Sequence, residues 1–240
     1  MFGFGKNEAV SEASPASTAL KEKIEKHEAA FNTVLKEKNL AVKVARVCMV
    51  MDVSGSMQGE FRDGTVQSIT ERIMPLGLQF DDNGELEFYI FSNDFEELEA
   101  ATMANIDGYV KHIVEPKAMW RGTSYAPVIQ AITKRYGKKD PSKDPTFVVF
   151  ITDGDNNDKP QATKAIIEAA KHNIFWKFVG VSSARMPYLE QLDDMEGRVV
   201  DNANFFQVKN INSMSDEELY TNLLKEYGDW IGKASMLGIL

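Results

Sequence analysis

The chain has 240 residues, a mass of 26.9 kDa and a formal net charge of −9 at pH 7. Its composition, 43% hydrophobic and 26% charged, is typical of a folded globular protein and excludes the collagen-like and strongly disordered classes. The negative charge argues against nucleic acid as a partner, because a phosphate backbone is bound through clustered Lys and Arg residues that displace its counterions. The length suits one α/β domain with appendages better than two full domains.

Residues 1–18 are rich in Ser, Ala, Gly and Glu and have no apolar period, so we predict a disordered tail. This start lacks the long apolar region of a signal peptide, and no window of the chain approaches the roughly 18 apolar residues of a membrane span. We therefore expect a cytoplasmic protein that does not insert into a membrane. Cys48 is the only cysteine and lies in an apolar run, which predicts a buried thiol and excludes an intramolecular disulfide.

An amphipathic helix is predicted over residues 19–39. Leu20, Ile24, Phe31 and Leu35 recur near helical spacing among Lys and Glu residues, which indicates one apolar face. That face must cover either the main domain or another chain.

Residues 40–212 are predicted to form one domain in which buried strands alternate with amphipathic helices. This alternation is the pattern of a mostly parallel sheet covered on both faces. A short turn after the second strand indicates a hairpin, so one edge strand should be antiparallel. We therefore predict a Rossmann-like, doubly wound α/β fold. The predicted strands are Val42–Met51, Leu86–Phe91, Glu96–Ala101, Thr146–Thr152, Phe175–Val181 and Phe205–Val208, and the predicted helices are Thr65–Phe80, Ile106–Val114, Tyr125–Tyr136, Gln161–His172 and Met186–Met195.

Residues 213–240 contain a predicted C-terminal helix that packs on or near the domain. It should run from Asp216 to about Ile231 with one apolar stripe, and Ser215 is a suitable N-cap before an acidic first turn. The predicted fold thus carries one flanking helix at each end.

Oxygen-bearing side chains follow the first predicted strand at alternate positions. Asp52, Ser54 and Ser56 can converge on one point, because alternate residues of an extended chain point the same way. Gly55 allows a tight turn between the two serines. One carboxylate and two hydroxyls form half of a site for a hard metal ion. We expect Asp52 to stand at a solvent-facing strand end.

Two further segments end at the same edge of the predicted sheet. Thr123 supplies a hydroxyl where a loop meets a predicted helix, and Asp153 follows the strand Thr146–Thr152. In open α/β sheets ligands bind outside the carboxyl ends of the strands, where the strand order reverses. Unpaired N–H groups at the start of the helix after Thr123 would add an attraction for an arriving carboxylate.

These segments together resemble a known metal site. Asp-x-Ser-Gly-Ser after the first strand, Gly-Thr before a middle helix and Thr-Asp-Gly after the fourth strand are similar to the metal-ion-dependent adhesion site (MIDAS) of von Willebrand factor type A (vWA) domains. The resemblance covers roughly residues 45–208 and implies the vWA fold. The single-domain layout with flanking helices is most similar to bacterial intracellular tellurium-resistance and stress-response vWA proteins. The five metal ligands that it implies are Asp52, Ser54, Ser56, Thr123 and Asp153.

The resemblance implies a protein-interaction module. Asp52 and Asp153 would balance the charge of one divalent ion, whose open position would take a Glu or Asp carboxylate of a protein partner. Few protein ligands and several retained waters suit Mg²⁺, with Mn²⁺ or Ca²⁺ as alternatives. We expect no small-molecule substrate and no catalysis.

Two other interpretations stay open. A metal-dependent hydrolase would use the ion to activate water, but His27, His112 and His172 have no metal-ligand spacing and are expected to face solvent or to lie at helix ends. Walker-type and serine-nucleophile motifs are also absent from the sequence. A helix-mediated scaffold would instead bind its partner without metal, through the two flanking helices.

Four residues beside the implied site have less specific roles. Asp155 and Asp158 follow Asp153 in a loop that lacks the terminal Glu of an EF-hand, so we expect both carboxylates to be solvated. Trp120 and Arg121 precede the Thr123 loop, where they either contact an acidic partner residue or simply pack and face solvent.

Overall fold

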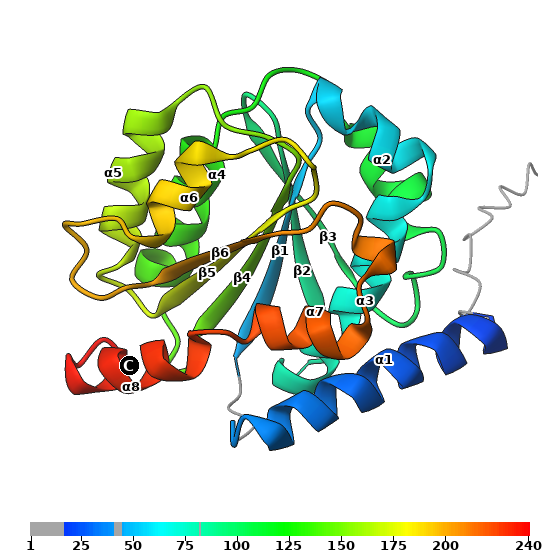
Figure 1. Ribbon diagram of the computed structural model, residues 1–240, viewed down its shortest axis with the longest axis horizontal. Helices are drawn as coiled ribbons and strands as arrows, with labels where there is room; N and C mark the ends of the chain where they lie inside the picture. The colour runs from blue at the N-terminus through cyan, green and yellow to red at the C-terminus, as the bar shows by residue number, and fades with distance from the viewer. Residues whose placement is uncertain (1–16, 41–44, 82) are drawn as a thin grey trace, which may run out of the picture.

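The computed structural model describes residues 17–40, 45–81 and 83–240. The predicted tail lies outside these residues except for its last two, and so does the predicted start of the first strand at Val42. The described part forms a six-stranded sheet in the order β3-β2-β1-β4-β5-β6, with only β3 antiparallel to its neighbour (Figure 1). The predicted α/β fold class is therefore confirmed. The strands are β1 Arg46–Asp52, β2 Leu86–Phe91, β3 Phe95–Ala101, β4 Thr146–Thr152, β5 Ile174–Gly180 and β6 Ala203–Gln207.

Helices cover both faces of this sheet, because the strands are apolar on both sides. Along β1, Val47 and Met49 belong to a core shared with α1, α3, α7 and α8, whereas Cys48 and Val50 belong to a second core shared with α4, α5 and α6. The predicted burial of the Cys48 thiol is confirmed, and burial raises its pKa well above the usual range. No helix of the described residues combines the length and apolarity needed to cross a bilayer. The helices and helical turns are α1 Thr18–Glu37, η1 Gly55–Met57, α2 Gln58–Arg62, α3 Thr65–Phe80, η2 Val110–Val114, η3 Glu115–Lys117, α4 Ala126–Lys134, η4 Arg135–Lys139, α5 Lys159–Ala169, α6 Pro187–Asp193, η5 Ile211–Ser213, α7 Asp216–Leu223 and α8 Tyr227–Met236.

Two predicted helices differ from the observed ones. The segment 106–114 was expected to be one α-helix, but Gly108 takes a left-handed φ of +68° and only the π-helical turn η2 follows it. The single C-terminal helix is also wrong, because Glu226 takes a φ of +68° and separates α7 from α8. This break lets Tyr227 and Trp230 pack on Phe175, with ring centroids 5.5 and 5.4 Å apart from it.

The N-terminal helix α1 packs on the domain rather than standing free. Phe31 lies between Phe80 of α3 and Tyr220 of α7, with ring centroids 5.3 and 5.1 Å away. On the same face the Nδ1 atom of buried His27 lies 2.6 Å from a carboxylate oxygen of Asp216. His27 was expected at a helix end or facing solvent, and that prediction is wrong because α7 covers it.

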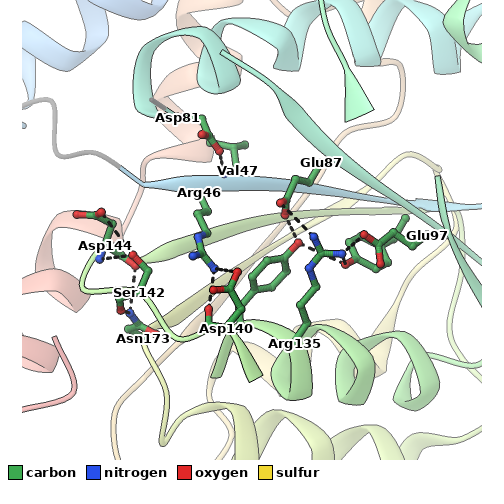
Figure 2. A network of polar contacts seen from close by, with 12 residues as sticks. Arg46, Val47, Asp81, Glu87, Glu97, Arg135, Asp140, Ser142, Asp144 and Asn173 are labelled. Atoms are coloured by element: carbon green, nitrogen blue, oxygen red, sulfur yellow. Dashed lines mark hydrogen bonds and ion pairs between the residues drawn. The ribbon is translucent and has the colours of Figure 1, made fainter. Parts of the chain in front are cut away.

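The edge of the sheet where the parallel strands begin is closed by ion pairs (Figure 2). Arg135 lies between Glu87 and Glu97 and forms ion pairs with both. Arg46 at the start of β1 reaches the carboxylate of Asp140 at 3.1 Å. These ion pairs connect the strands to the segment that contains Arg135 and Asp140. The predicted metal ligands lie at the opposite edge of the sheet.

Buried Lys177 on β5 makes the stability of the fold depend on pH. Its ammonium donates to the side chain of Asn204 and to the carbonyl oxygen of Lys225, where α7 ends. Burial lowers the pKa of Lys177 to about 7, although the charges of Glu226 and Asp193 partly oppose this shift. The unfolded chain therefore binds one more proton than the folded chain between pH 7 and the usual lysine pKa, so the contribution of Lys177 to stability increases as pH rises through this window.

We predict that Lys177→Met removes this increase. Between pH 7 and pH 9 the free energy of unfolding of the natural protein should gain about 2 kcal/mol relative to the variant, at about 1.4 kcal/mol per pH unit for one proton. Urea unfolding of both proteins at several pH values in this window measures the difference. A constant difference between the two proteins would contradict the prediction.

Candidate metal centre

The predicted ligands Asp52 and Asp153 lie at the carboxyl ends of two adjacent central strands. Asp52 is the last residue of β1, and Asp153 follows directly after β4, which pairs with β1 in parallel. The chain extends the sheet from β1 through β2 to β3 in one direction and from β4 to β6 in the other. The two carboxylates therefore stand where the strand order reverses, which is the usual ligand position in open α/β sheets.

Asp52 is held rigidly by two hydrogen bonds. Its Oδ1 accepts the backbone N–H of Ser54 at 2.7 Å, and its Oδ2 accepts the hydroxyl of Thr152 at 2.7 Å. Asp52 is wholly buried, so the expectation of a solvent-facing strand end is wrong. The physical reason is the loop before α4, which crosses the end of β1: the N–H of Trp120 donates to the carbonyl of Val53 at 3.0 Å.

Two hydroxyls connect the two carboxylate-bearing segments. The Oγ atoms of Ser54 and Ser56 lie 3.1 Å apart, and the Ser56 hydroxyl donates to Oδ1 of Asp153 at 2.9 Å. The helical turn η1 brings Ser56 round toward β4, and the N–H of Gly55 donates to the carbonyl of Arg121 at 3.0 Å. Four of the five predicted ligands are thus assembled at one point.

Thr123 reaches the same edge of the sheet through its loop. The N–H of Asn157 donates to the carbonyl of Thr123 at 2.8 Å, and the N–H of Ser124 donates to the carbonyl of Ser92 at 2.7 Å. Within the described ranges, the Thr123 hydroxyl forms no hydrogen bond with the other four predicted ligands. The structure therefore tethers the Thr123 backbone and leaves its hydroxyl available.

Asp158 caps the helix that follows Thr123. Its carboxylate accepts the backbone N–H groups of Tyr125 and Ala126 at 2.9 and 2.8 Å, where α4 begins. A carboxylate at this position is favoured by the helix dipole and by the unpaired N–H groups of the first turn. The expected attraction of a partner carboxylate to these donors is therefore wrong, because Asp158 already occupies them.

Asp155 has a comparable role. Its carboxylate accepts the ammonium of Lys159 at 2.7 Å and the backbone N–H of Tyr188 at 3.2 Å, in the first turn of α6. Both loop aspartates were expected to be solvated, and both instead position helices around the site. These contacts could not be predicted from the sequence, because each aspartate is distant in sequence from the helix whose N–H groups donate to it.

The electrostatics of the centre favour a cation. Burial raises the pKa of Asp52 to about 6, although its hydrogen bonds with Thr152 and Ser54 oppose the shift, and burial also raises the pKa of Asp153. No Lys, Arg or His of the described chain forms an ion pair with either carboxylate. Asp52 is buried and Asp153 is half-buried, and two such carboxylates without a countercharge are costly unless a cation compensates their charge.

The donor set fits a small, hard divalent ion. Two carboxylates and two or three hydroxyls are oxygen donors, which Mg²⁺ prefers, and they leave coordination positions for water. In the part of the chain that the structure describes, no three His, Cys, Asp or Glu side chains form a cluster that could hold a metal. The hydroxyls of Ser54, Ser56 and Thr123 are therefore needed to complete a metal site here.

The two residues before Thr123 take different roles. Trp120 is half-buried with a φ of +49°, and its ring stands edge-on to Phe61 of α2 with 5.1 Å between ring centroids. Arg121 is exposed beside the centre. Packing thus accounts for Trp120, whereas Arg121 remains free to meet a partner. The sequence also gave no sign of the role of Thr152, whose hydroxyl orients Asp52.

Comparisons with known proteins identify the family and the fold of the chain. A model of the family described as "vWA-TerF-like: vWA found in TerF C terminus" matches residues 44–240. The uncharacterized protein YcbR of Bacillus subtilis (strain 168) is 37% identical over 211 residues, which cover 86% of this chain and 86% of YcbR.

Solved structures show the same fold at low identity. A von Willebrand factor type A structure from Catenulispora acidiphila has a TM-score of 0.55 at 13% identity, over 75% of this chain and 42% of that one. Proximal thread matrix protein 1 from the mussel byssus, solved with a zinc-occupied MIDAS motif, has a TM-score of 0.51 at 16% identity, over 75% of this chain and 48% of that one. The chain thus spans less than half the length of these two structures.

We predict that Thr152→Val weakens Mg²⁺ binding at this centre. Loss of the hydroxyl removes a hydrogen bond that orients Asp52, and such outer contacts typically change metal affinity 10- to 100-fold, so we expect a loss of about tenfold. Thr70→Val is the matched control, because Thr70 is equally buried and its hydroxyl donates to the carbonyl of Val66 within α3. Calorimetric titration of both variants decides the matter, and equal affinities would contradict the role of Thr152.

Proposed function

Because the chain belongs to the TerF-like family of von Willebrand factor A domains, we propose that it is a metal-dependent protein-interaction module. In this proposal one divalent ion, Mg²⁺ in the first place, is held by Asp52, Ser54, Ser56, Thr123 and Asp153. The bound ion supplies an open position that takes a Glu or Asp carboxylate of a protein partner. The observation that carries the proposal is a pair of carboxylates from adjacent strand ends, one buried and one half-buried, which are joined through two hydroxyls and form no ion pair among the described residues.

The proposed metal ligands have different roles in the site. Asp52, fixed by Ser54 and Thr152, is an anchor whose position does not depend on the partner. Ser56 and Asp153 close the other side of the centre, and the available hydroxyl of Thr123 faces no competing hydrogen bond. The zinc in the MIDAS motif of the mussel protein supports a divalent ion in this fold.

Binding without catalysis is the function that we propose for this centre. A hydrolase needs a general base within hydrogen-bond reach of the metal-activated water. His27 is paired with Asp216 between α1 and α7, and His172 follows α5 at the opposite edge of the sheet. The apolar faces of α1 and α7 are buried in the domain core, so they do not favour a scaffold that binds through these helices.

The biological setting that we propose is a bacterial tellurium-resistance or stress-response system. The support is the family to which the chain belongs and the sequence resemblance of its metal-site motifs. The partner would be a protein that presents an acidic residue on a protruding surface, because the centre lies at the edge of the sheet between crossing loops.

We predict that Asp52→Asn abolishes Mg²⁺ binding. The amide keeps the size of the side chain but removes the charge that the ion requires, and an amide suits the buried position better than a cavity would. Asp107→Asn is the control, because Asp107 is exposed on a turn away from the sheet edge. Calorimetric titration with Mg²⁺ and Mn²⁺ measures the change, and an unchanged affinity in Asp52→Asn would exclude this residue from the site.

Thr123→Ala should separate metal binding from partner binding. The change removes one hydroxyl ligand and leaves both carboxylates, so we expect a modest loss of Mg²⁺ affinity and a larger loss of partner capture. Capture from the native cell with Mg²⁺, repeated with EDTA, measures the partner side. Capture that resists both EDTA and this substitution would show that the partner binds elsewhere on the protein.

A further inference from the structure

Helices α4 and α5 cover the same face of the sheet (Figure 1). A groove of about 370 Å³ lies between them. Three lysines surround it, Lys134 and Lys138 from α4 and η4 and Lys164 from α5, and Ala165 lies among its lining residues. We refer to these four residues as the basic groove. The groove shares no residue with the metal centre.

A second hollow of about 620 Å³ lies on the other side of α4, toward the edge strand β3. It shares Gln130 and Lys134 with the basic groove, so the two hollows form one surface that crosses α4. Phe95 and Pro127 add apolar area to this second hollow, and Phe95 is 36% exposed. The combined surface is therefore hollowed and partly apolar.

The positive charges of the basic groove are only partly neutralised within the described residues, by Glu168, which also lines the groove. Lys138 shares Glu168 with Lys171, at 3.1 and 2.7 Å, and these two lysines lower the pKa of Glu168 to about 2. Lys134 and Lys164 form no ion pair in the described part of the chain. Two unpaired ammonium groups thus face one groove in a chain of net charge −9.

Helix dipoles account for the position of Lys134 but not for that of Lys164. Cations in the last turn of a helix are favoured by the negative end of its dipole, which explains Lys134 at the end of α4. Lys164 lies in the middle of α5, where the dipole has little effect, and is still directed to the same groove. Lysines from two helices thus line one groove, where a single anionic ligand would contact both.

We propose that this surface across α4 is a docking site for an acidic segment of a protein partner, separate from the metal centre. Carboxylates of the segment would pair with Lys134 and Lys164, and its apolar side chains would cover Phe95 and Pro127. Exposed ion pairs are individually weak, so several pairs and the apolar contact must act together. Nucleic acid fits less well, because the net charge of −9 would repel a long phosphate backbone beyond the groove.

The docking surface and the metal centre can be tested independently. Lys134 ends α4, about 12 Å along the helix axis from Ala126 near the metal centre. A labelled twelve-residue peptide of Glu-Glu-Leu repeats, titrated with the full chain in EDTA and low salt, probes the surface while no metal is bound. We expect saturable binding by fluorescence anisotropy that weakens as salt is raised, and no binding of the same peptide with Gln in place of Glu.

The double variant Lys134→Glu/Lys164→Glu should weaken peptide binding at least about tenfold. Lys21→Glu/Lys26→Glu is the matched control, because both lysines are exposed on α1 and the net charge changes by the same amount. Equal losses in the two double variants, or no saturable binding by the natural protein, would overturn the proposal. It would equally be overturned by a single-stranded oligonucleotide of the same charge that displaces the peptide and binds more tightly.

Discussion

The buried carboxylate of Asp52 is the constraint on which the rest of the site depends. It ends the central strand β1, accepts one hydrogen bond from the turn that follows and one from the end of β4, and has no cation beside it among the described residues. Burial of an uncompensated carboxylate is unfavourable, and this cost supports our proposal that a bound cation supplies positive charge here. A further buried carboxylate would add to this cost, which explains why hydroxyls complete the proposed set of metal ligands.

Hydrogen bonds between the loops, in addition to those of the sheet, fix the loops around the centre. Asp158 caps α4, Asp155 holds α6, and the segment 120–124 is tied to Val53 and Gly55. An acidic loop after β4 therefore orders the segment that carries Thr123. A metal centre assembled from three loops gains its precision from such contacts, because each loop alone would be free to move.

The two surfaces that we propose for binding use opposite charges. The metal centre would present a cation inside an acidic setting, and the basic groove presents Lys134 of α4 and Lys164 of α5, which form no ion pair among the described residues. Both would attract acidic groups, so one acidic partner that reaches both surfaces would gain from linked binding. The flanking helices contribute differently: α1 and α7 close the other face of the sheet through Phe31 and the contact of His27 with Asp216.

The amino-acid sequence alone determined the doubly wound fold and the positions of Asp52, Ser54, Ser56 and Asp153 at strand ends, because apolar periodicity and short motifs depend on residues close together in the chain. The tertiary structure decided what no local pattern contains. Tertiary packing buries Asp52 and places His27 against α7. It also brings Asp155 and Asp158 within hydrogen-bond distance of the first turns of α6 and α4, and it brings lysines of α4 and α5 to one groove. Each of these outcomes joins segments that are distant in sequence, and such contacts depend on how the layers pack rather than on the identity of neighbouring residues.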